Sequence, residues 1–213
     1  MIVAIDGPAG AGKSTVARQL AERLGFRYLY TGAMYRALTW LAMQQGLPLG
    51  DGQPLGELAA ANPVTFDEAG RVSIGGTDVT ALIRRSNIDR NVPVVARHPA
   101  VREVMRELQR ELGHQGDVVI EGRDIGTVVA PDAAVKVYLN ADPAIRARRR
   151  QVERPDIGRD ALATDLRQRD EHDKARMQPA PDAEQIDPTS LQVEDVVERI
   201  EQLVQERLAA SRR

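Results

Sequence analysis

Near its amino terminus the chain reads Ile2-Val3-Ala4-Ile5-Asp6, then Gly7-Pro8-Ala9-Gly10-Ala11-Gly12-Lys13-Ser14. The second part matches the pattern G-x-x-x-x-G-K-S. The apolar run before it predicts a buried strand, and the apolar spacing of Val16, Leu20 and Leu24 after it predicts a helix. A strand, a glycine-rich loop and a helix in this order are the context in which the pattern binds phosphate groups. We therefore expect a phosphate-binding loop here.

The chemistry of such a loop explains its residue types. Backbone N–H groups in a turn of small residues, together with a helix N-terminus, form a concave positive nest for anionic phosphates. We expect Lys13 to span the β- and γ-phosphates of ATP, Ser14 to take one position on Mg²⁺, and Thr15 to lie beside the α-phosphate. A glycine-rich turn that only caps a helix is the alternative, which the complete motif disfavours. The residues assigned to ATP are Gly7, Pro8, Ala9, Gly10, Ala11, Gly12, Lys13, Ser14 and Thr15.

Length and composition narrow the class of protein. A chain of 213 residues, 42% of them hydrophobic, is long enough for one globular core with a small insertion. No apolar run approaches the roughly 18 residues that a membrane span needs, and no signal peptide is recognisable. The chain has no cysteine, which excludes thiolate chemistry and fits a cytoplasmic protein. A net charge of −2 argues against nonspecific binding to nucleic acid.

The part of the chain after the first helix combines helices with a small β element. Apolar residues at helical spacing, short alternating runs and glycine or proline breaks mark the elements. We expect substrate choice to be built into the β insertion. The predicted elements are an extended segment at 26–30, a helix from 31 to about 46, a hairpin within 64–74, a short helix opened by 77–80 and ending near 83, and a polar stretch at 86–97 interrupted by Asn91-Val92-Pro93.

The second half of the chain returns to alternating strands and helices, which is typical of a parallel sheet. Strand 117–121 ends in Gly122-Arg123-Asp124, and ligands of open α/β sheets bind at the carboxyl ends of such strands. Glu121 or Asp124 is therefore a candidate to orient Mg²⁺ waters or substrate, with a solvated turn as the alternative. The other predicted elements are a helix at 101–112, a strand at 135–139, a helix from 142, a helix at 159–176, a brief strand at 186 and a final helix at 193–208.

A helical hairpin in this half is rich in arginine. Arg148-Arg149-Arg150 precedes a breaker-rich loop at 153–158, and further arginines follow on the next helix. A helix, a loop and a helix with arginines on both stems are what a lid that closes over phosphates would need. An ordinary salt-bridged hairpin is the alternative, because Glu and Asp interleave with these arginines.

Four further segments carry specific combinations of residues. They are Thr31-Gly32-Ala33-Met34-Tyr35-Arg36, Pro99-Ala100-Val101-Arg102-Glu103, Glu121-Gly122-Arg123-Asp124-Ile125-Gly126-Thr127-Val128-Val129 and Arg169-Asp170-Glu171-His172-Asp173-Lys174-Ala175-Arg176. Together with the phosphate loop, these segments resemble the bacterial cytidylate kinases, which belong to the nucleoside monophosphate (NMP) kinase group. The resemblance covers essentially the whole chain, and the third segment is its most specific part.

The resemblance implies an α/β fold: a three-layer P-loop NTPase architecture with a parallel five-stranded core sheet, a small β-containing NMP-binding insertion and a helical lid. It implies a single P-loop kinase unit over 1–213. Within this unit the core comprises 1–36, 97–150 and 176–213, the insertion about 51–96 and the lid about 148–170.

The resemblance also assigns roles to individual residues. Arg102 and Asp124 would read the cytosine, whose N4 amine is a donor beside the N3 and O2 acceptors. Uracil would present an oxygen to Asp124 instead, so we expect a preference for cytosine. Asp173 would accept from the ribose or deoxyribose hydroxyl, and Arg169 would lie near the sugar and the lid. Those implied around the CMP phosphate are Arg36, Arg123, Arg176 and Thr31; the candidate catalytic residues are Lys13, Arg123, Arg169 and Arg176.

One position departs from the family pattern. Members often have a serine that touches the base six residues before the proline of the P-x-V-R motif, and counting back from Pro99 gives Pro93. Proline has no side-chain donor, so this contact is either missing or supplied by Ser86 or Asn91. The departure affects base selectivity rather than phosphoryl transfer.

The sequence therefore predicts an enzyme that moves the ATP γ-phosphoryl to CMP or dCMP with the help of Mg²⁺. We expect a cytoplasmic monomer without a nucleic-acid or membrane partner. Two alternatives stay open: a P-loop kinase for another small acceptor, such as UMP, shikimate or a sugar acid, and a nucleotide-dependent switch. The switch is disfavoured because the chain lacks a guanine-reading N-K-x-D motif.

Overall fold

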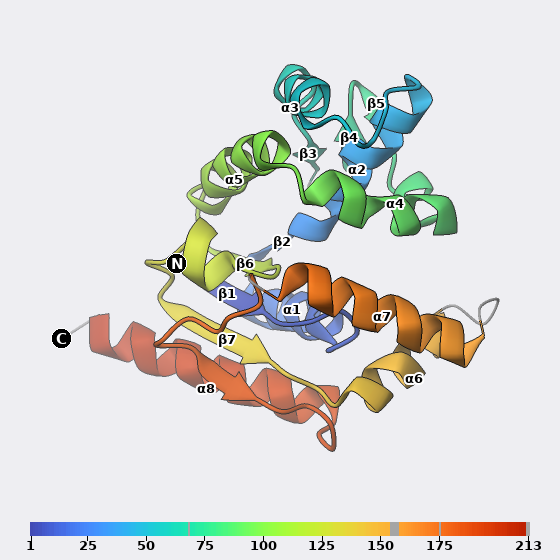
Figure 1. Cartoon of the computed structure of the whole chain (residues 1–213). Coiled ribbons are helices and arrows are strands. Elements are labelled where there is room, and N and C mark those ends of the chain that lie inside the picture. The colour runs from blue at the N-terminus through green and yellow to red at the C-terminus, as the bar shows by residue number, and fades with distance from the viewer. Residues whose placement is uncertain (68, 154–157, 175, 212–213) are drawn as a thin grey trace. The chain divides into compact units, whose positions relative to one another are not determined.

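The computed structural model describes residues 1–67, 69–153, 158–174 and 176–211 (Figure 1). These residues form two compact units. Unit 1 consists of Met1–Leu29 and Gly113–Arg213, and unit 2 consists of Tyr30–Leu112. The predicted insertion of about 51–96 falls within unit 2, while the division into core, insertion and lid stays a prediction.

Unit 1 is built on a five-stranded sheet, as predicted. The strand order is β2-β6-β1-β7-β8, with β1 in the centre. β1 pairs in parallel with both β6 and β7, and β7 pairs in parallel with β8. The strands are β1 (Ile2–Asp6), β2 (Arg27–Tyr30), β6 (Val118–Glu121), β7 (Val135–Leu139) and β8 (Glu184–Ile186).

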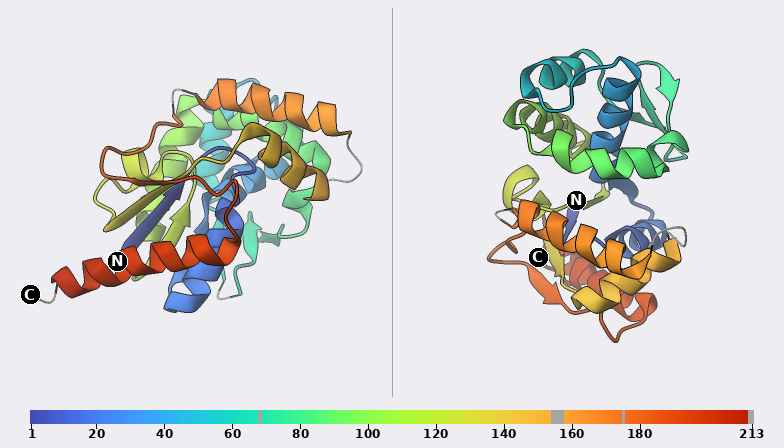
Figure 2. Two further views of the ribbon diagram at one scale, coloured as in Figure 1. Left: turned by 90° about the horizontal axis from the view of Figure 1, so that it is seen from below. Right: turned by 45° about the vertical axis from the view of Figure 1, so that its right-hand side comes forward.

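Helices of unit 1 cover this sheet and flank its carboxyl edge (Figure 2). α1 and α8 pack their apolar stripes on one face of the sheet, where Val16, Leu20, Val197 and Ile200 join Ile5 in a buried cluster. α6 and α7 pack against each other. The loop predicted between these two helices includes residues 154–157, which lie outside the described residues. The helices are α1 (Lys13–Leu24), the π-helical turn η2 (Ile125–Val129), α6 (Pro143–Glu153), α7 (Arg159–Asp173) and α8 (Val193–Ser211).

The alternation of side chains along the strands decides which polar groups reach each face of the sheet. Val3 and Ile5 of β1 enter the cluster beneath α1 and α8, so Asp6 points to the opposite face. Its register partner on β7 is Tyr138. Glu121 is the register partner of Ile5 and therefore lies on the side of α1. The carboxylates of Asp6 and Glu121 are therefore both buried at the carboxyl edge of the sheet, but on opposite faces.

Unit 2 has its own hydrophobic core between helices and a small antiparallel sheet. Met34 and Leu38 of α2 pack there with Leu55, Ile74 and Met105. The sheet order is β3-β4-β5. The elements are α2 (Thr31–Gln44), α3 (Gly52–Ala61), β3 (Thr65–Phe66), β4 (Val72–Ile74), β5 (Thr77–Asp78), the 3₁₀ turn η1 (Leu82–Arg84), α4 (Ser86–Ala96) and α5 (Pro99–Gly113).

The prediction that 77–80 opens a short helix was wrong, although the 3₁₀ turn η1 (Leu82–Arg84) includes Ile83, near which that helix was expected to end. Thr77–Asp78 forms β5, which pairs antiparallel with β4 so that Ile74 faces Thr77. Gly75 and Gly76 lie between them with φ of 57° and 75°. Two consecutive residues with positive φ form the tight hairpin turn that suits the twist of paired strands, so the glycine pair extends the hairpin into a third strand.

The prediction that Pro93 interrupts 86–97 was also wrong. α4 runs continuously from Ser86 to Ala96 with Pro93 inside it. Proline cannot donate to the carbonyl one turn earlier, which is that of Asp89, and this costs helix stability. Burial of Ile88 and Val95 on the inner face of α4 supplies the compensating tertiary packing.

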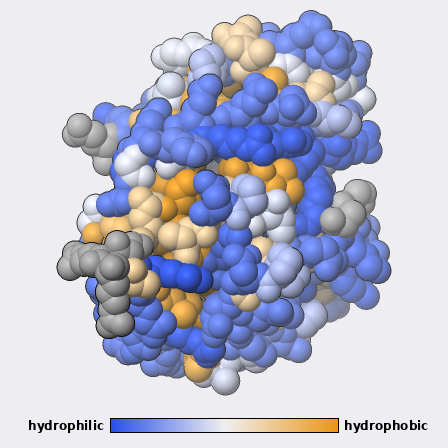
Figure 3. Space-filling view, turned by 90° about the vertical axis from the view of Figure 1, so that its left-hand side faces the viewer, coloured by the Kyte–Doolittle hydropathy of each residue, from blue (hydrophilic) through white to orange (hydrophobic). Residues whose placement is uncertain are grey.

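Hydrophilic residues dominate the molecular face in Figure 3, with hydrophobic residues showing in smaller patches. Within the described residues, no helix combines the length and the apolar character that crossing a membrane requires.

Candidate active site

The phosphate loop lies between β1 and α1, as the sequence predicts. Gly7 has a φ of 144°, and a Cβ built on it would lie 2.2 Å from the carbonyl oxygen of Leu139. Gly12 has a φ of 95° and precedes the first residue of α1 without a side-chain cap. The first N–H groups of a helix have no partner within the helix. The end of α1 therefore presents backbone donors and the positive end of its dipole to an anion.

Lys13 is buried at the start of α1. Its side chain curls back over the loop, and Nζ donates to the carbonyl oxygen of Pro8 at 2.8 Å. Burial and then the positive charge of Arg123 lower the pKa of Lys13 from 10.5 to about 7, against the opposing effect of Glu121 and Asp6. An arriving phosphate would supply the negative charge that this ammonium group lacks.

Ser14 and Glu121 form the oxygen-rich side of the loop. Ser14 Oγ donates to Glu121 Oε2 at 3.0 Å, and the hydroxyl of Tyr28 donates to the other carboxylate oxygen. No cluster of three or more acidic, histidine or cysteine side chains suited to a metal occurs in the described part of the chain. Mg²⁺ is commonly held by one or two protein oxygens plus substrate phosphates, so this hydroxyl and carboxylate fit it as donors.

Arg123 and Arg176 are brought together by Asp173. Arg123 Nε donates to Asp173 Oδ2 at 3.3 Å, and Arg176 Nη2 donates to Oδ1 at 2.6 Å. Arg123 also donates to the carbonyl oxygen of Gly7 at 3.2 Å, which ties it to the phosphate loop. Two guanidinium groups sharing one carboxylate beside a phosphate loop make a positively charged surface at the carboxyl edge of the sheet.

Asp6 holds the segment that carries Arg123 and Asp124, and the sequence analysis did not single it out. Its two carboxylate oxygens accept from the backbone N–H groups of Ile125 and Gly126 at 2.9 and 2.8 Å. Burial raises the pKa of Asp6, while these two hydrogen bonds act in the opposite direction. The carboxylate thus fixes the backbone just after the predicted base-reading residue.

Two arginines of α6 donate hydrogen bonds to backbone carbonyls of the phosphate loop. Arg146 donates to the carbonyl oxygens of Ala9 and Ala141 at 3.1 and 3.2 Å, and to Asp170 Oδ2 at 2.6 Å. Arg149 donates to the carbonyl oxygen of Ala11 at 3.2 Å. These bonds engage the carbonyl oxygens of Ala9 and Ala11 from α6 and so tie the loop to that helix. The sequence drew attention to Arg149 only as a lid residue and missed Arg146.

The remaining predicted residues of unit 1 lie on α7 and beside β6. Arg169 faces Asp165 one turn earlier, with Nε 3.0 Å from Oδ2. Asp124 directly precedes η2 and is half-buried. Thr15 is exposed on the first turn of α1.

The predicted residues of unit 2 occupy three helical positions. Thr31 is buried at the start of α2, and Arg36 lies one and a half turns further along the same helix. Arg36 pairs with Asp89 of α4, which sequence reasoning missed. Arg102 is half-buried on α5, with its backbone N–H bonded to the carbonyl of His98. Of the proposed serine replacements, Asn91 uses its amide to donate to the Asn87 carbonyl at 2.8 Å.

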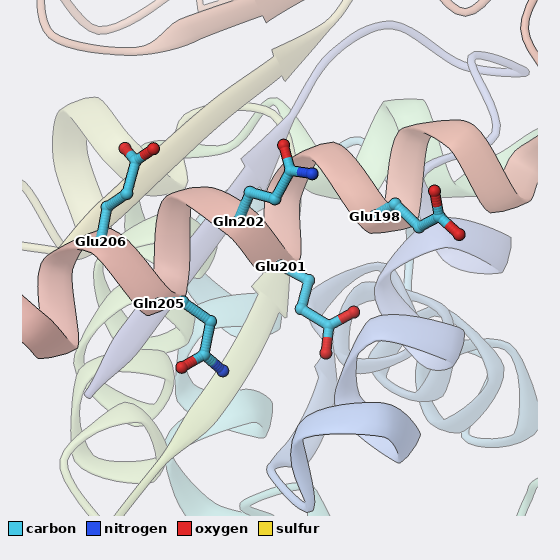
Figure 4. A pocket seen from close by; sticks show the side chains of 5 residues that line it. All are labelled: Glu198, Glu201, Gln202, Gln205 and Glu206. Atoms are coloured by element: carbon cyan, nitrogen blue, oxygen red, sulfur yellow. The ribbon is translucent and has the colours of Figure 1, made fainter.

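A surface depression of about 610 Å³ lies elsewhere, on the outer side of α8 (Figure 4). Glu201 at its edge pairs with Arg23 of α1 at 3.2 Å. Its lining side chains carry carboxylates and amides but no cation, so it is unsuited to a phosphate. The lining residues are Glu198, Glu201, Gln202, Gln205 and Glu206.

Comparison with known proteins agrees with this phosphate-loop geometry. The family model described as cytidylate kinase matches residues 3–206. The chain belongs to the cytidylate kinase family. The resemblance noted from the sequence is thereby confirmed.

Curated members of this family align with nearly the whole chain. A cytidylate kinase of Shouchella clausii is 46% identical over 215 residues, which cover 96% of each chain. One of Pelotomaculum thermopropionicum is 49% identical over 210 residues, 93% of each chain. Among solved structures, a shikimate kinase from Bacteroides thetaiotaomicron has a TM-score of 0.50 at 18% identity, covering 96% of this chain and 98% of that one. This last similarity shows a shared P-loop kinase fold.

Proposed function

We propose that the protein transfers the γ-phosphoryl group of ATP to the 5′-phosphate of CMP or dCMP, giving ADP and CDP or dCDP. The observation that carries the proposal is membership of the cytidylate kinase family over residues 3–206, which include the complete phosphate loop. The name of the curated relatives states the activity that we extend to this chain.

On the donor side, the loop N–H groups and Lys13 bind the phosphates of ATP. The Lys13 ammonium group contacts the β- and γ-phosphates, and the backbone N–H donors fix the orientation of these phosphates. Ser14 and Glu121 would hold Mg²⁺, which neutralises charge on the phosphates when bound. Arg146 and Arg149 keep the loop in its binding conformation through the carbonyls of Ala9 and Ala11.

On the acceptor side, we assign Arg36, Arg123 and Arg176 to the phosphate of CMP, with Thr31 beside it. The Asp173 bridge supports this role for two of the arginines, because it holds their guanidinium planes in place before substrate arrives. A carboxylate oxygen has more than one lone pair, so Asp173 can also accept from the sugar hydroxyl. Arg169 lies near the sugar and the lid in this assignment.

We assign the recognition of cytosine to Arg102 and Asp124. The N4 amine of cytosine donates to a carboxylate, whereas the O4 atom of uracil would leave that carboxylate without its donor. An unmatched buried polar group costs about 1–3 kcal/mol, which corresponds to a preference of roughly ten- to a hundredfold. Anchoring of the following backbone by Asp6 supports a fixed position for the Asp124 main chain.

Catalysis in this proposal consists of positioning and of charge stabilisation. The acceptor is a phosphate that is already ionised, so no side chain has to remove a proton from it. The transition state of phosphoryl transfer spreads negative charge over the transferred group, and Lys13, Arg123, Arg169 and Arg176 supply cations for it. Exclusion of water by the helical hairpin α6–α7 would limit hydrolysis of ATP. The cytoplasmic location and the monomeric state stay predictions.

The test is an acceptor panel in a coupled assay of ADP release, with CMP, dCMP, UMP and shikimate each added to Mg-ATP. We expect turnover with CMP and dCMP, weaker turnover with UMP and none with shikimate. Lys13→Ala should lose most of this turnover, while Lys174→Ala, which removes an exposed lysine, should retain it. Preference for another acceptor would overturn the substrate assignment, and ADP release without any acceptor would favour a nucleotide switch.

A further inference from the structure

Arg36 of α2 is held by three partners within unit 2. Its Nη2 donates to Asp89 Oδ1 at 2.5 Å, its Nε to the hydroxyl of Tyr30 at 3.2 Å and its Nη1 to the carbonyl oxygen of Ile83 at 3.3 Å. Each of the three guanidinium nitrogens is therefore engaged once. A guanidinium group has five N–H donors, so one N–H remains on each of the two Nη atoms. Two donors on adjacent Nη atoms can pair with two oxygens of a phosphate.

Asp89 is the only one of these three partners that carries a full negative charge. Its side chain is 4% exposed and that of Arg36 is 16% exposed. Burying a guanidinium group without a counter-charge is costly, because it loses its hydration without compensation. Asp89 and the two neutral acceptors therefore hold the Arg36 guanidinium in a largely buried position and restrict its rotation.

We propose that Asp89 is a positioning residue for the acceptor phosphate: it holds the Arg36 guanidinium so that its two remaining Nη–H donors face the 5′-phosphate of the nucleoside monophosphate. The inference rests on the proposed function, which assigns Arg36 to that phosphate. Asp89 acts through Arg36 and does not touch the substrate itself.

The same contacts allow an alternative, in which Asp89 competes with the phosphate for the Arg36 guanidinium and must release it before the phosphate binds. The positions of the three bonds favour positioning, because they leave a donor on both Nη atoms. Under positioning, losing the carboxylate lets Arg36 rotate and weakens CMP binding. Under competition, losing it frees Arg36 and strengthens CMP binding. The two readings therefore predict opposite signs.

The experiment measures the KM values of CMP and ATP for Asp89→Ala, Asp89→Asn and Arg36→Met, with thermal unfolding of each variant as a check on folding. Asparagine keeps an oxygen acceptor at the same reach, so it should largely restore the position of Arg36. We expect Asp89→Ala to raise the KM of CMP about tenfold or more, as for loss of a hydrogen bond to a charged group. Asp89→Asn should stay within a few fold of the wild type, and the KM of ATP should be unchanged in both.

Asp67→Asn is the matched control. Asp67 pairs with Arg71 in the hairpin of unit 2, where both side chains are substantially exposed, so this change should leave both KM values unaltered. Cytidine, which lacks the phosphate, provides a second readout as a competitive inhibitor. Its inhibition constant should be the same for wild type and Asp89→Ala, because the defect concerns only the phosphate. Should Asp89→Ala fail to fold, Asp89→Ser replaces it in the same comparison.

The outcomes distinguish a failure of the proposal for Asp89 from a failure of the proposed function. A lower KM of CMP in Asp89→Ala and Asp89→Asn would overturn positioning in favour of competition. If Asp89→Ala weakened the binding of CMP, ATP and cytidine by the same factor, Asp89 would have only a structural role. An unchanged KM of CMP in Asp89→Ala, alongside a raised one in Arg36→Met, would refute the inference alone. An unchanged KM of CMP in Arg36→Met would instead refute the assignment of Arg36 in the proposed function.

Discussion

Binding of ATP at pH 8 should be accompanied by uptake of about one proton, and Lys13 is the group that takes it up. In the ligand-free protein, burial and the neighbouring Arg123 lower the pKa of Lys13 to about 7. The β- and γ-phosphates would bring negative charge next to Nζ and favour its protonated form. The lysine therefore regains its charge on binding, when the charge is needed.

The number of protons taken up on ATP binding follows from the pKa of Lys13. With a pKa of about 7, Lys13 is half protonated at pH 7 and roughly nine-tenths neutral at pH 8. If the phosphates restore the ordinary pKa near 10.5, the uptake is about 0.9 proton at pH 8, about 0.5 at pH 7 and small at pH 6. Apparent ATP affinity should consequently weaken as the pH rises from 7 to 9.

Isothermal titration calorimetry with a non-hydrolysable ATP analogue and Mg²⁺ measures this uptake directly. The observed enthalpy is plotted against the ionisation enthalpy of several buffers, and the slope gives the number of protons bound. Lys13→Arg should show no uptake, because arginine stays charged throughout this range. Lys174→Ala should show the same uptake as the wild type. A wild-type slope of zero at pH 8 would refute the argument.

Stability gives an independent readout that needs no ligand. The folded state releases the Lys13 proton near pH 7, whereas the unfolded chain keeps it up to about 10.5. Between these values the unfolded state binds more protons, so the contribution of Lys13 makes the free energy of unfolding rise with pH. Denaturant titrations of wild type and Lys13→Met from pH 7 to 10 should therefore diverge, with the variant lacking this rise. Parallel curves would contradict the lowered pKa.

Three further predictions concern residues around the loop. Asp124→Asn should reduce the ratio of kcat/KM for CMP over UMP by roughly ten- to a hundredfold; equal loss with both acceptors would point to a structural or metal role. Arg146→Met should lower the free energy of unfolding by about 3 kcal/mol and raise the KM of ATP more than that of CMP, because it breaks the largely buried ion pair with Asp170 and frees the Ala9 carbonyl of the loop. Thermal unfolding and steady-state kinetics check both effects, and an unchanged KM of ATP would argue against a role of Arg146 in holding the loop. Tyr138→Phe removes only the hydroxyl that donates to the Met177 carbonyl at 3.0 Å, so it should cost about 1 kcal/mol of stability and raise the KM of CMP a few fold by loosening Arg176; a kinetically silent variant would exclude this anchoring role.

The features that sequence predicted well are those that neighbouring residues encode. Gly7, Gly12 and Lys13 belong to one contiguous segment, so their residue types and spacing are enough to predict a phosphate loop from the sequence. The helix α1, which ends at Leu24 with Gly25 as its C-cap, and the strands of the core sheet likewise follow from local patterns. The assignment to a family was possible because its motifs are contiguous.

The errors and omissions have a different origin. Pro93 is accommodated within α4 because buried packing outweighs a missing hydrogen bond, and no local rule contains that balance. Asp6 and Gly126 are separated by 120 residues, Arg146 and Ala9 by 137, and Arg36 and Asp89 by 53. An isolated acid or arginine in a sequence does not indicate such a partner.

The sequence by itself determined the position of the phosphate loop and the family to which the chain belongs, because both are encoded in contiguous motifs. Only the tertiary structure decided how the charged groups are held. The parity of β1 and β6 places Asp6 on one face of the sheet and Glu121 on the other, and the position of α6 brings Arg146 to the Ala9 carbonyl of the loop. Orienting a buried ion requires partners from distant segments, since one segment cannot satisfy all its hydrogen bonds alone.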